Sequence, residues 1–292
     1  MQWLESTQYL LSQGFVQQSL IACALLGLLS GVMTPLIVLR RMSFAVHGTS
    51  ELALMGASAA LLFGANVGFG AVAGAVVAAI VLALLGNKQQ DSAVGVVMSF
   101  GLGLSVLFIH LYPGNSKAAL SLLTGQIVGL RSDSLLLLGA VTAIVVLTVV
   151  LLWRPLLFAS IDPLMASIAG VKVRQYGILF AVLIGLTAAQ SVQIVGALLV
   201  MALLITPGAA AVEITTSPVA VVVWSVIFAE VSAVGGLLLS LAPGVPVSVF
   251  VTGISFGIYL ICRVVAWVQS RHVDAHDAAP SLIAPGQEGC HP

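Results

Sequence analysis

The sequence predicts an all-α protein, a polytopic transmembrane bundle of eight or nine helices. Composition is the first observation: 60% of the 292 residues are hydrophobic and only 7% are charged, whereas a soluble domain carries roughly 25% charged residues. The second is that the apolar residues are gathered into runs of about 20, the length of helix that crosses a hydrocarbon core of about 30 Å. We therefore expect a membrane protein whose own helices direct its insertion.

Seven runs of this length are candidate spans, namely 20–39, 44–63, 66–86, 92–111, 134–153, 218–241 and 247–268. A further stretch, 175–212, is apolar over nearly twice the length of one span. Its middle carries Gln190, Gln193 and Gly196, which predicts two short helices that meet at a polar kink. The chain then crosses the membrane nine times, or eight times if one half of this stretch is re-entrant.

The basic residues between the spans predict the orientation, because Lys and Arg gather in cytoplasmic loops. If nine spans alternate, Arg40, Lys88, Lys172 and Arg271 all lie on one side. That side should be the cytoplasm, which places the loop 112–133 outside. The transmembrane domain then covers 20–268.

The two ends of the chain are expected on opposite sides of the membrane. Residues 1–19 form an external segment, and residues 269–292 form a cytoplasmic tail that is polar and rich in Ala and Pro. The tail contains possible metal ligands, which are His272, Asp274, His276, Asp277, Cys290 and His291. A metal sensor is one interpretation of the tail. Disorder is the favoured one, because no scaffold fixes any pair of these ligands.

Several function classes are excluded. The net charge is zero, whereas a nucleic-acid-binding domain needs a basic patch. The three cysteines, Cys23, Cys262 and Cys290, are scattered and suggest no disulfide framework. The sequence also lacks the Gly-rich motif that cradles nucleotide phosphates. Energy for any transport must therefore come from a partner or a gradient.

Ionisable residues inside the predicted spans carry the chemistry, since each costs about 3 kcal/mol at a helix centre unless it is paired or hydrated. His47 and Glu51 are four residues apart, so a helix places them on one face. An imidazole and a carboxylate suit zinc, manganese or iron(II). The alternative is a mutual hydrogen bond that only satisfies both groups.

Two other ionisable residues lie in or near the spans. Glu230 could complete a metal site from a different helix, or could form a helix–helix hydrogen bond to a Ser or Thr. His110 lies near the external end of its span, where an interfacial position is expected. The pairs Gly27/Gly31, Gly64/Gly68 and Gly70/Gly74 have the spacing that lets helices pack closely in lipid.

Four segments, in order, resemble the zinc/manganese/iron(II) ABC importer permeases. They are "LRRMSFAVHGTSELALMG", "DSAVGVVMSFGLGL", "LLTGQIVGLRSDSLLLL" and "QIVGALLVMALLITPGAAAVEI". The family's first segment has an Asp and a His four residues apart, which act as metal ligands in the translocation path. His47 and Glu51 occupy these two positions in the inverted order, so the resemblance implies that this pair handles the metal.

A further segment, "SIDPLMASIAGVKV" (160–173), resembles the short cytoplasmic coupling helix on which such a permease meets its ATPase. Asp162 and Pro163 would start this helix, Ala166 and Ala169 would be its small packing residues, and Gly170 would end it. These residues are therefore expected to contact the ATPase.

The resemblance implies the rest of the system. A separate cytoplasmic ATPase would drive import, an extracytoplasmic protein would deliver the metal, and a second permease copy would complete a homodimer or heterodimer. No permanently bound cofactor is expected, and the membrane is the bacterial cytoplasmic membrane. The alternatives are a secondary transporter that uses the same buried pair as an ion relay, and a permease for a siderophore or cobalamin.

Overall fold

The structure, a computed structural model, describes residues 13–85, 90–114, 122, 132–196, 200–241 and 246–277. All regular elements in these ranges are helices, which confirms the all-α prediction. They are α2 (Gly14–Leu39), α3 (Ser43–Leu62), α4 (Val67–Leu85), α5 (Gln90–Leu111), α7 (Ser132–Leu151), α8 (Trp153–Ile161), α9 (Pro163–Ile168), α10 (Val173–Val195), α11 (Val200–Leu204), α12 (Thr206–Ile214), α13 (Pro218–Leu241) and α14 (Val247–Asp277).

Six of these helices are long and apolar enough to cross a membrane. They are α2, α5, α7, α10, α13 and α14. Shorter apolar helices cover 67–82 and 200–214. The helix α3 is also long, with 20 residues. Its sequence, however, contains several polar residues, including His47 and Glu51, the predicted metal ligands. The protein is therefore a multi-pass membrane protein.

The stretch 175–212 differs from its prediction. The helix α10 runs without a break through Gln190 and Gln193 and ends at Val195. The break comes at Gly196, whose φ of 87° lies in the left-handed region that favours glycine. The first half is therefore a full span of 23 residues, and only the second half is divided, into α11 and α12. The kink was correctly expected here, but the two glutamines do not form it.

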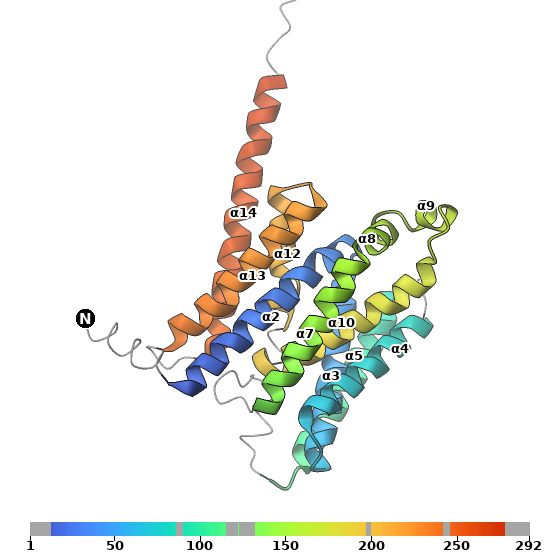
Figure 1. Cartoon of the computed structure of the whole chain (residues 1–292), viewed down its shortest axis with the longest axis vertical. Helices are drawn as coiled ribbons and strands as arrows, with labels where there is room; N and C mark the ends of the chain where they lie inside the picture. The colour runs from blue at the N-terminus through green and yellow to red at the C-terminus, as the bar shows by residue number, and fades with distance from the viewer. Residues whose placement is uncertain are drawn as a thin grey trace, which may run out of the picture.

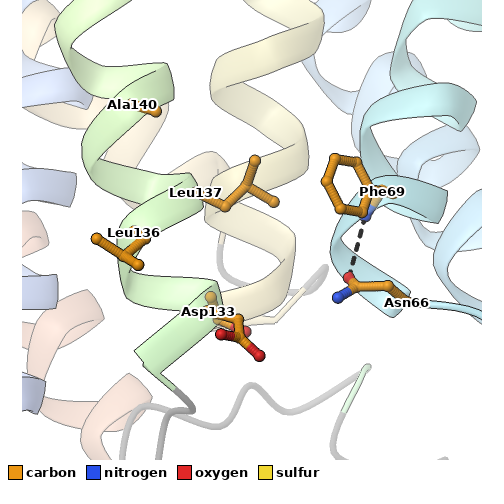
Figure 2. A pocket seen from close by; sticks show the side chains of 7 residues that line it. Asn66, Phe69, Asp133, Leu136, Leu137 and Ala140 are labelled. Atoms are coloured by element: carbon orange, nitrogen blue, oxygen red, sulfur yellow. Dashed lines mark hydrogen bonds between the residues drawn. The ribbon is translucent and has the colours of Figure 1, made fainter.

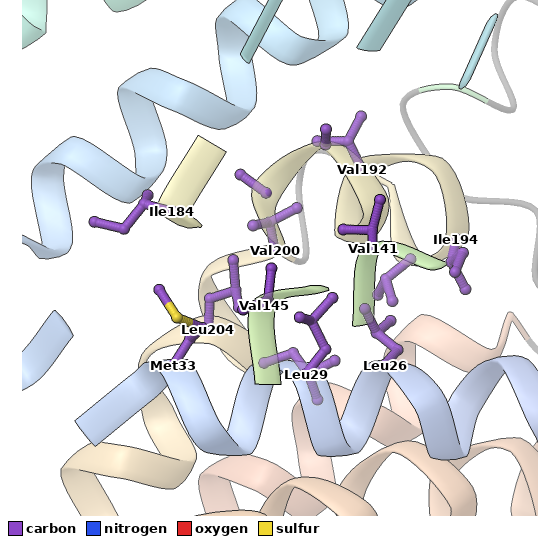
Figure 3. Packing of buried hydrophobic residues seen from close by; sticks show 14 of the residues in the cluster. Leu26, Leu29, Met33, Val141, Val145, Ile184, Val192, Ile194, Val200 and Leu204 are labelled. Carbon is purple, nitrogen blue, oxygen red and sulfur yellow. The ribbon is translucent and has the colours of Figure 1, made fainter. Parts of the chain in front are cut away.

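The core lies between α2 and α10, whose transmembrane windows are each 72% buried, against 17% for α5 and for α14. Figure 3 shows side chains from α2, α7, α10 and α11 meeting in this core. Its labelled residues are Leu26, Leu29, Met33, Val141, Val145, Ile184, Val192, Ile194, Val200 and Leu204. The central helices thus form a fixed frame, and α5 and α14 lie at its edge.

Small residues bring several helices into backbone contact, as predicted for two of the three glycine pairs. Gly27 and Gly31 of α2 lie against α13, where an added Cβ would meet Glu230 and Val226. The pair Gly70/Gly74 of α4 lies against Gly56 of α3. In the third pair, Gly64 does not pack: its φ is 70° and it lies in the turn after α3.

One end of the bundle carries α8, α9 and the projecting end of α14 (Figure 1). The helix α14 continues beyond the predicted span 247–268 as far as Asp277, so the first part of the predicted tail is helical. Residues 278–292, most of the loop 112–133 and Lys88 lie outside the described residues, as do residues 1–12.

Candidate metal site in the membrane

His47 and Glu51 lie one turn apart on α3 and line the same small cavity of about 90 Å³ between α3 and α5. Met98, Ser99 and Leu102 of α5 form the rest of its lining. Glu51 is only 6% exposed, and His47 is half-buried. The structure therefore brings together the two residues that the sequence pairs.

Two glycines let α5 lie close to the polar face of α3. A Cβ added at Gly48 would lie 3.0 Å from Cγ1 of Val94 and 3.6 Å from Cγ of Met98. A Cβ added at Gly101 would lie 3.4 Å from the carbonyl oxygen of Glu51. These close approaches leave a narrow site, in which a small ion fits better than a bulky ligand.

The hydroxyl groups around the pair are occupied by their own helices. Thr49 Oγ1 donates to the carbonyl oxygen of Ala45 at 2.9 Å, and Ser50 Oγ donates to that of His47 at 2.8 Å. Ser99 Oγ donates to the carbonyl oxygen of Gly95 at 3.0 Å. The imidazole and the carboxylate are therefore the groups that remain available to a ligand.

His47 and Glu51 do keep unused polar atoms. Nδ1 of His47 and Oε2 of Glu51 are buried and have no hydrogen-bond partner. Within the described helices no hydrogen bond or ion pair joins the two side chains, so the mutual hydrogen bond considered above is not formed. A buried polar atom without a partner costs about 1–3 kcal/mol. A cation coordinated by both atoms would offset that cost.

Glu230 lies elsewhere. It is on α13 and faces α2 at Gly27, where an added Cβ would lie 2.9 Å from the carboxyl carbon of Glu230. Among the described residues, no group of three or more His, Cys, Asp or Glu side chains could hold a metal ion. Within one chain the structure therefore does not add Glu230 to the pair. His110, at the end of α5, is exposed.

The short helix α9 forms where it was expected. Oδ1 of Asp162 accepts a hydrogen bond from the backbone N–H of Met165 at 2.9 Å, Pro163 is the first helical residue, and Gly170 follows the helix with a φ of 84°. These are the usual signals for a helix start and stop. The loop therefore presents a rigid turn of helix.

The exposed face of α9 differs from the one the sequence suggested. Ala166 is fully buried, whereas Leu164, Met165 and Ile168 are 69%, 54% and 73% exposed. Ala169 is exposed as well. A partner could therefore contact Ala169, as predicted, and also these three apolar side chains, which the sequence analysis did not name. The sequence feature that could have revealed them is that three apolar residues lie on a helix of only six residues, which is too short to bury all of them.

A larger hollow of about 340 Å³ lies between α4 and α7 (Figure 2). Its lining is mostly apolar, with Phe69 and Leu137 among the labelled side chains. Asn66 Oδ1 accepts from the backbone N–H groups of Gly68 and Phe69, at 2.8 and 3.3 Å, so its oxygen already caps α4. His47 and Glu51 do not line this pocket.

Comparison with known proteins identifies the family of the chain. Residues 12–266 match the family model described as the ABC 3 transport family. The chain is 30% identical to the manganese transport system membrane protein MntC of Halalkalibacterium halodurans, over 79% of this chain and 80% of that protein. It is 27% identical to the high-affinity zinc uptake system membrane protein ZnuB of Haemophilus influenzae, over 76% and 86% respectively.

A solved structure is similar over nearly the whole chain. It is a chain of PsaBC from Streptococcus pneumoniae in complex with Fab, with a TM-score of 0.81 and 27% sequence identity, covering 89% of this chain and 94% of that one. The family match begins before α2, ends within α14, and includes His47, Glu51 and α9. The chain therefore belongs to the ABC 3 transport family.

Proposed function

We propose that this chain is the membrane-spanning permease subunit of an ABC importer that moves a divalent transition-metal ion, zinc, manganese or iron(II), into the cytoplasm. The class of system is supported by the relatives named as manganese and zinc transport membrane proteins. The single observation that carries the site is the pair of buried, unpartnered atoms on His47 and Glu51, which face one cavity inside the membrane domain.

The chemistry of the pair suits a carried ion. The carboxylate of Glu51 offsets part of the charge of a dication, which is costly to bring into a low-dielectric interior. The imidazole of His47 adds a nitrogen ligand that divalent transition metals accept. Two ligands from one chain hold an ion more weakly than a closed set of four, and weak binding permits release on the far side.

The energy comes from outside this chain. Cytoplasmic ATPase subunits dock on α9, and its exposed Leu164, Met165 and Ile168 are suited to an apolar groove. Asp162 and Gly170 hold the ends of that helix in shape. This chain itself catalyses no reaction.

Other partners complete the importer. An extracytoplasmic metal-binding protein delivers the ion at the opposite end of the bundle. A second permease copy, identical or homologous, encloses the path with this one. The assembly lies in the bacterial cytoplasmic membrane, with the loop that carries α9 on the cytoplasmic side.

Uptake of radioactive manganese and zinc by cells that express the whole importer tests the proposal. Glu51→Gln preserves the shape of the side chain and removes its charge, and uptake should fall on the order of tenfold or more. Glu230→Gln is the matched control, because it makes the same chemical change inside the membrane away from the pair. Normal uptake in the Glu51 variant, at equal membrane abundance, contradicts the proposal.

A further inference from the structure

Arg40 joins three helices at the end of the bundle that carries α9. Its Nε donates to Oγ of Ser160 on α8 at 2.7 Å, and one Nη donates to the carbonyl oxygen of Leu156 at 3.4 Å. Its guanidinium carbon lies 4.2 Å from the centre of the Phe180 ring of α10. The C-terminal end of α2 is thus held against α8 and α10 by one side chain.

The contacts of the Arg40 guanidinium form only while α2, α8 and α10 keep their relative positions. Burial lowers the pKa of Arg40 to about 10, which still leaves the group protonated at neutral pH. The three groups that contact it in the described part of the chain are a hydroxyl, a carbonyl and an aromatic ring, and all are neutral. Such dipole and ring contacts hold a cation only at short range and in the correct direction. A shift of α8 against α2 must therefore move Arg40 or break its contacts.

On one side, Ser160, which accepts a hydrogen bond from Arg40, is close in sequence to the proposed ATPase contact. Ser160 lies two residues before Asp162, which caps α9. The connection is short and regular, because the backbone N–H of Asp162 still donates to the carbonyl oxygen of Phe158 in α8. A displacement of α9 therefore also displaces Ser160.

On the other side Arg40 is close in sequence to His47 and Glu51. It lies three residues before Ser43, where α3 begins, and His47 is one turn further on. The corner between α2 and α3 is stiff: the backbone N–H of Arg41 donates to Val38 and that of Met42 donates to Ile37. Arg41 has a φ of 55°, which is uncommon for a residue other than glycine. Movement at Arg40 is thus passed on to α3.

We propose that Arg40 is a positioning residue that links the ATPase-docking helix α9 to α3, so that movement of α9 repositions His47 and Glu51. The inference rests on the proposed function. In it the guanidinium does not touch the metal; it transmits the displacement of α8 to the helix that holds the metal ligands.

The test uses the complete permease–ATPase complex in liposomes. Arg40→Gln should lower ATP-driven manganese transport about tenfold, in the range usual for coupling between sites. The manganese affinity of the complex and the amount of bound ATPase should stay unchanged. Arg41→Gln is the matched control, because it changes only an exposed side chain of the adjacent arginine and keeps the backbone N–H that donates to Val38; it should transport at the wild-type rate.

A second variant protects the test against misfolding. Ser160→Ala removes only the hydroxyl that accepts from Arg40, and it should lower transport less than Arg40→Gln. Because the two side chains act through one contact, the double variant should be no worse than Arg40→Gln alone.

Two results would overturn the inference. One is equal transport by Arg40→Gln and Arg41→Gln. The other is a loss in Arg40→Gln that is explained by lower abundance or weaker metal binding, together with normal transport in Ser160→Ala. A wild-type complex that carries neither manganese nor zinc would instead refute the proposed function, so the two failures are distinguishable.

Discussion

Two helix contacts in this protein each hold a carboxylate at membrane depth, and they treat it differently. At the contact of α2 with α13, Glu230 lies over Gly27, and nearby Thr34 and Ser225 share a hydrogen bond of 2.9 Å. At the contact of α3 with α5, Glu51 and His47 keep buried atoms without a partner. The first contact is closely packed at Gly27, and the second contains two buried polar atoms without a partner.

The comparison shows what an intramembrane charge does and does not indicate. Both glutamates are costly in lipid, and cost alone does not separate a packing role from a chemical one. The surroundings do separate them: of these two contacts, as far as the structure describes them, the α3–α5 contact alone combines two buried, unpartnered atoms with a cavity. Changes at α2–α13 should therefore alter stability, and changes at α3–α5 should alter metal binding.

Of the changes at Glu230 and at the α3–α5 contact, the larger effect on stability is expected at Gly27, which packs against Glu230. In Gly27→Ala the new methyl group would lie 2.9 Å from the carboxyl carbon and 3.1 Å from Cα of Glu230, so α2 and α13 must separate slightly. The free energy of unfolding should fall by about 1–3 kcal/mol, measured by thermal unfolding in detergent.

The matched control is Gly139→Ala in α7. There the nearest atom to an added Cβ is Cδ1 of Leu25, at an ordinary 3.9 Å. Because alanine favours a helix over glycine by about 1 kcal/mol, this variant should be neutral or slightly more stable. Equal destabilisation of the two variants would show that α2 and α13 are not closely packed at Glu230.

A smaller effect, of the opposite sign, is expected at the metal pair. Glu51→Gln removes a charge that has no partner in the metal-free protein, so the melting temperature without metal should be unchanged or slightly raised. Added manganese or zinc should stabilise the wild type by binding its folded state and should leave the variant almost unaffected. Clear destabilisation of the metal-free variant would mean that Glu51 holds the fold together.

Much of the fold could be predicted from hydropathy, because lipid requires long apolar helices whose backbone groups are satisfied internally. The kink predicted from Gln190, Gln193 and Gly196 was only partly right, because the helix does not break at the two glutamines. The helix continues there because its own backbone hydrogen bonds do not depend on side-chain polarity, and it stops only where Gly196 permits a positive φ.

The candidate site was predictable where it depends on local spacing. His47 and Glu51 are four residues apart, and helix geometry alone places them together. The position of Glu230 depends on how α13 packs on α2, which no local pattern specifies. The burial of Ala166 likewise depends on the contact of α9 with its neighbours, so its small size indicated packing within the chain and not a surface for a partner.

The central claim is that His47 and Glu51, and not Glu230, bind the transported ion. Equilibrium dialysis of manganese and zinc against the purified chain tests it directly. We expect His47→Ala and Glu51→Gln each to weaken binding by about 10–100-fold, and Glu230→Gln to bind as the wild type does. Wild-type affinity in both pair variants, or an equal loss in Glu230→Gln, would contradict the account.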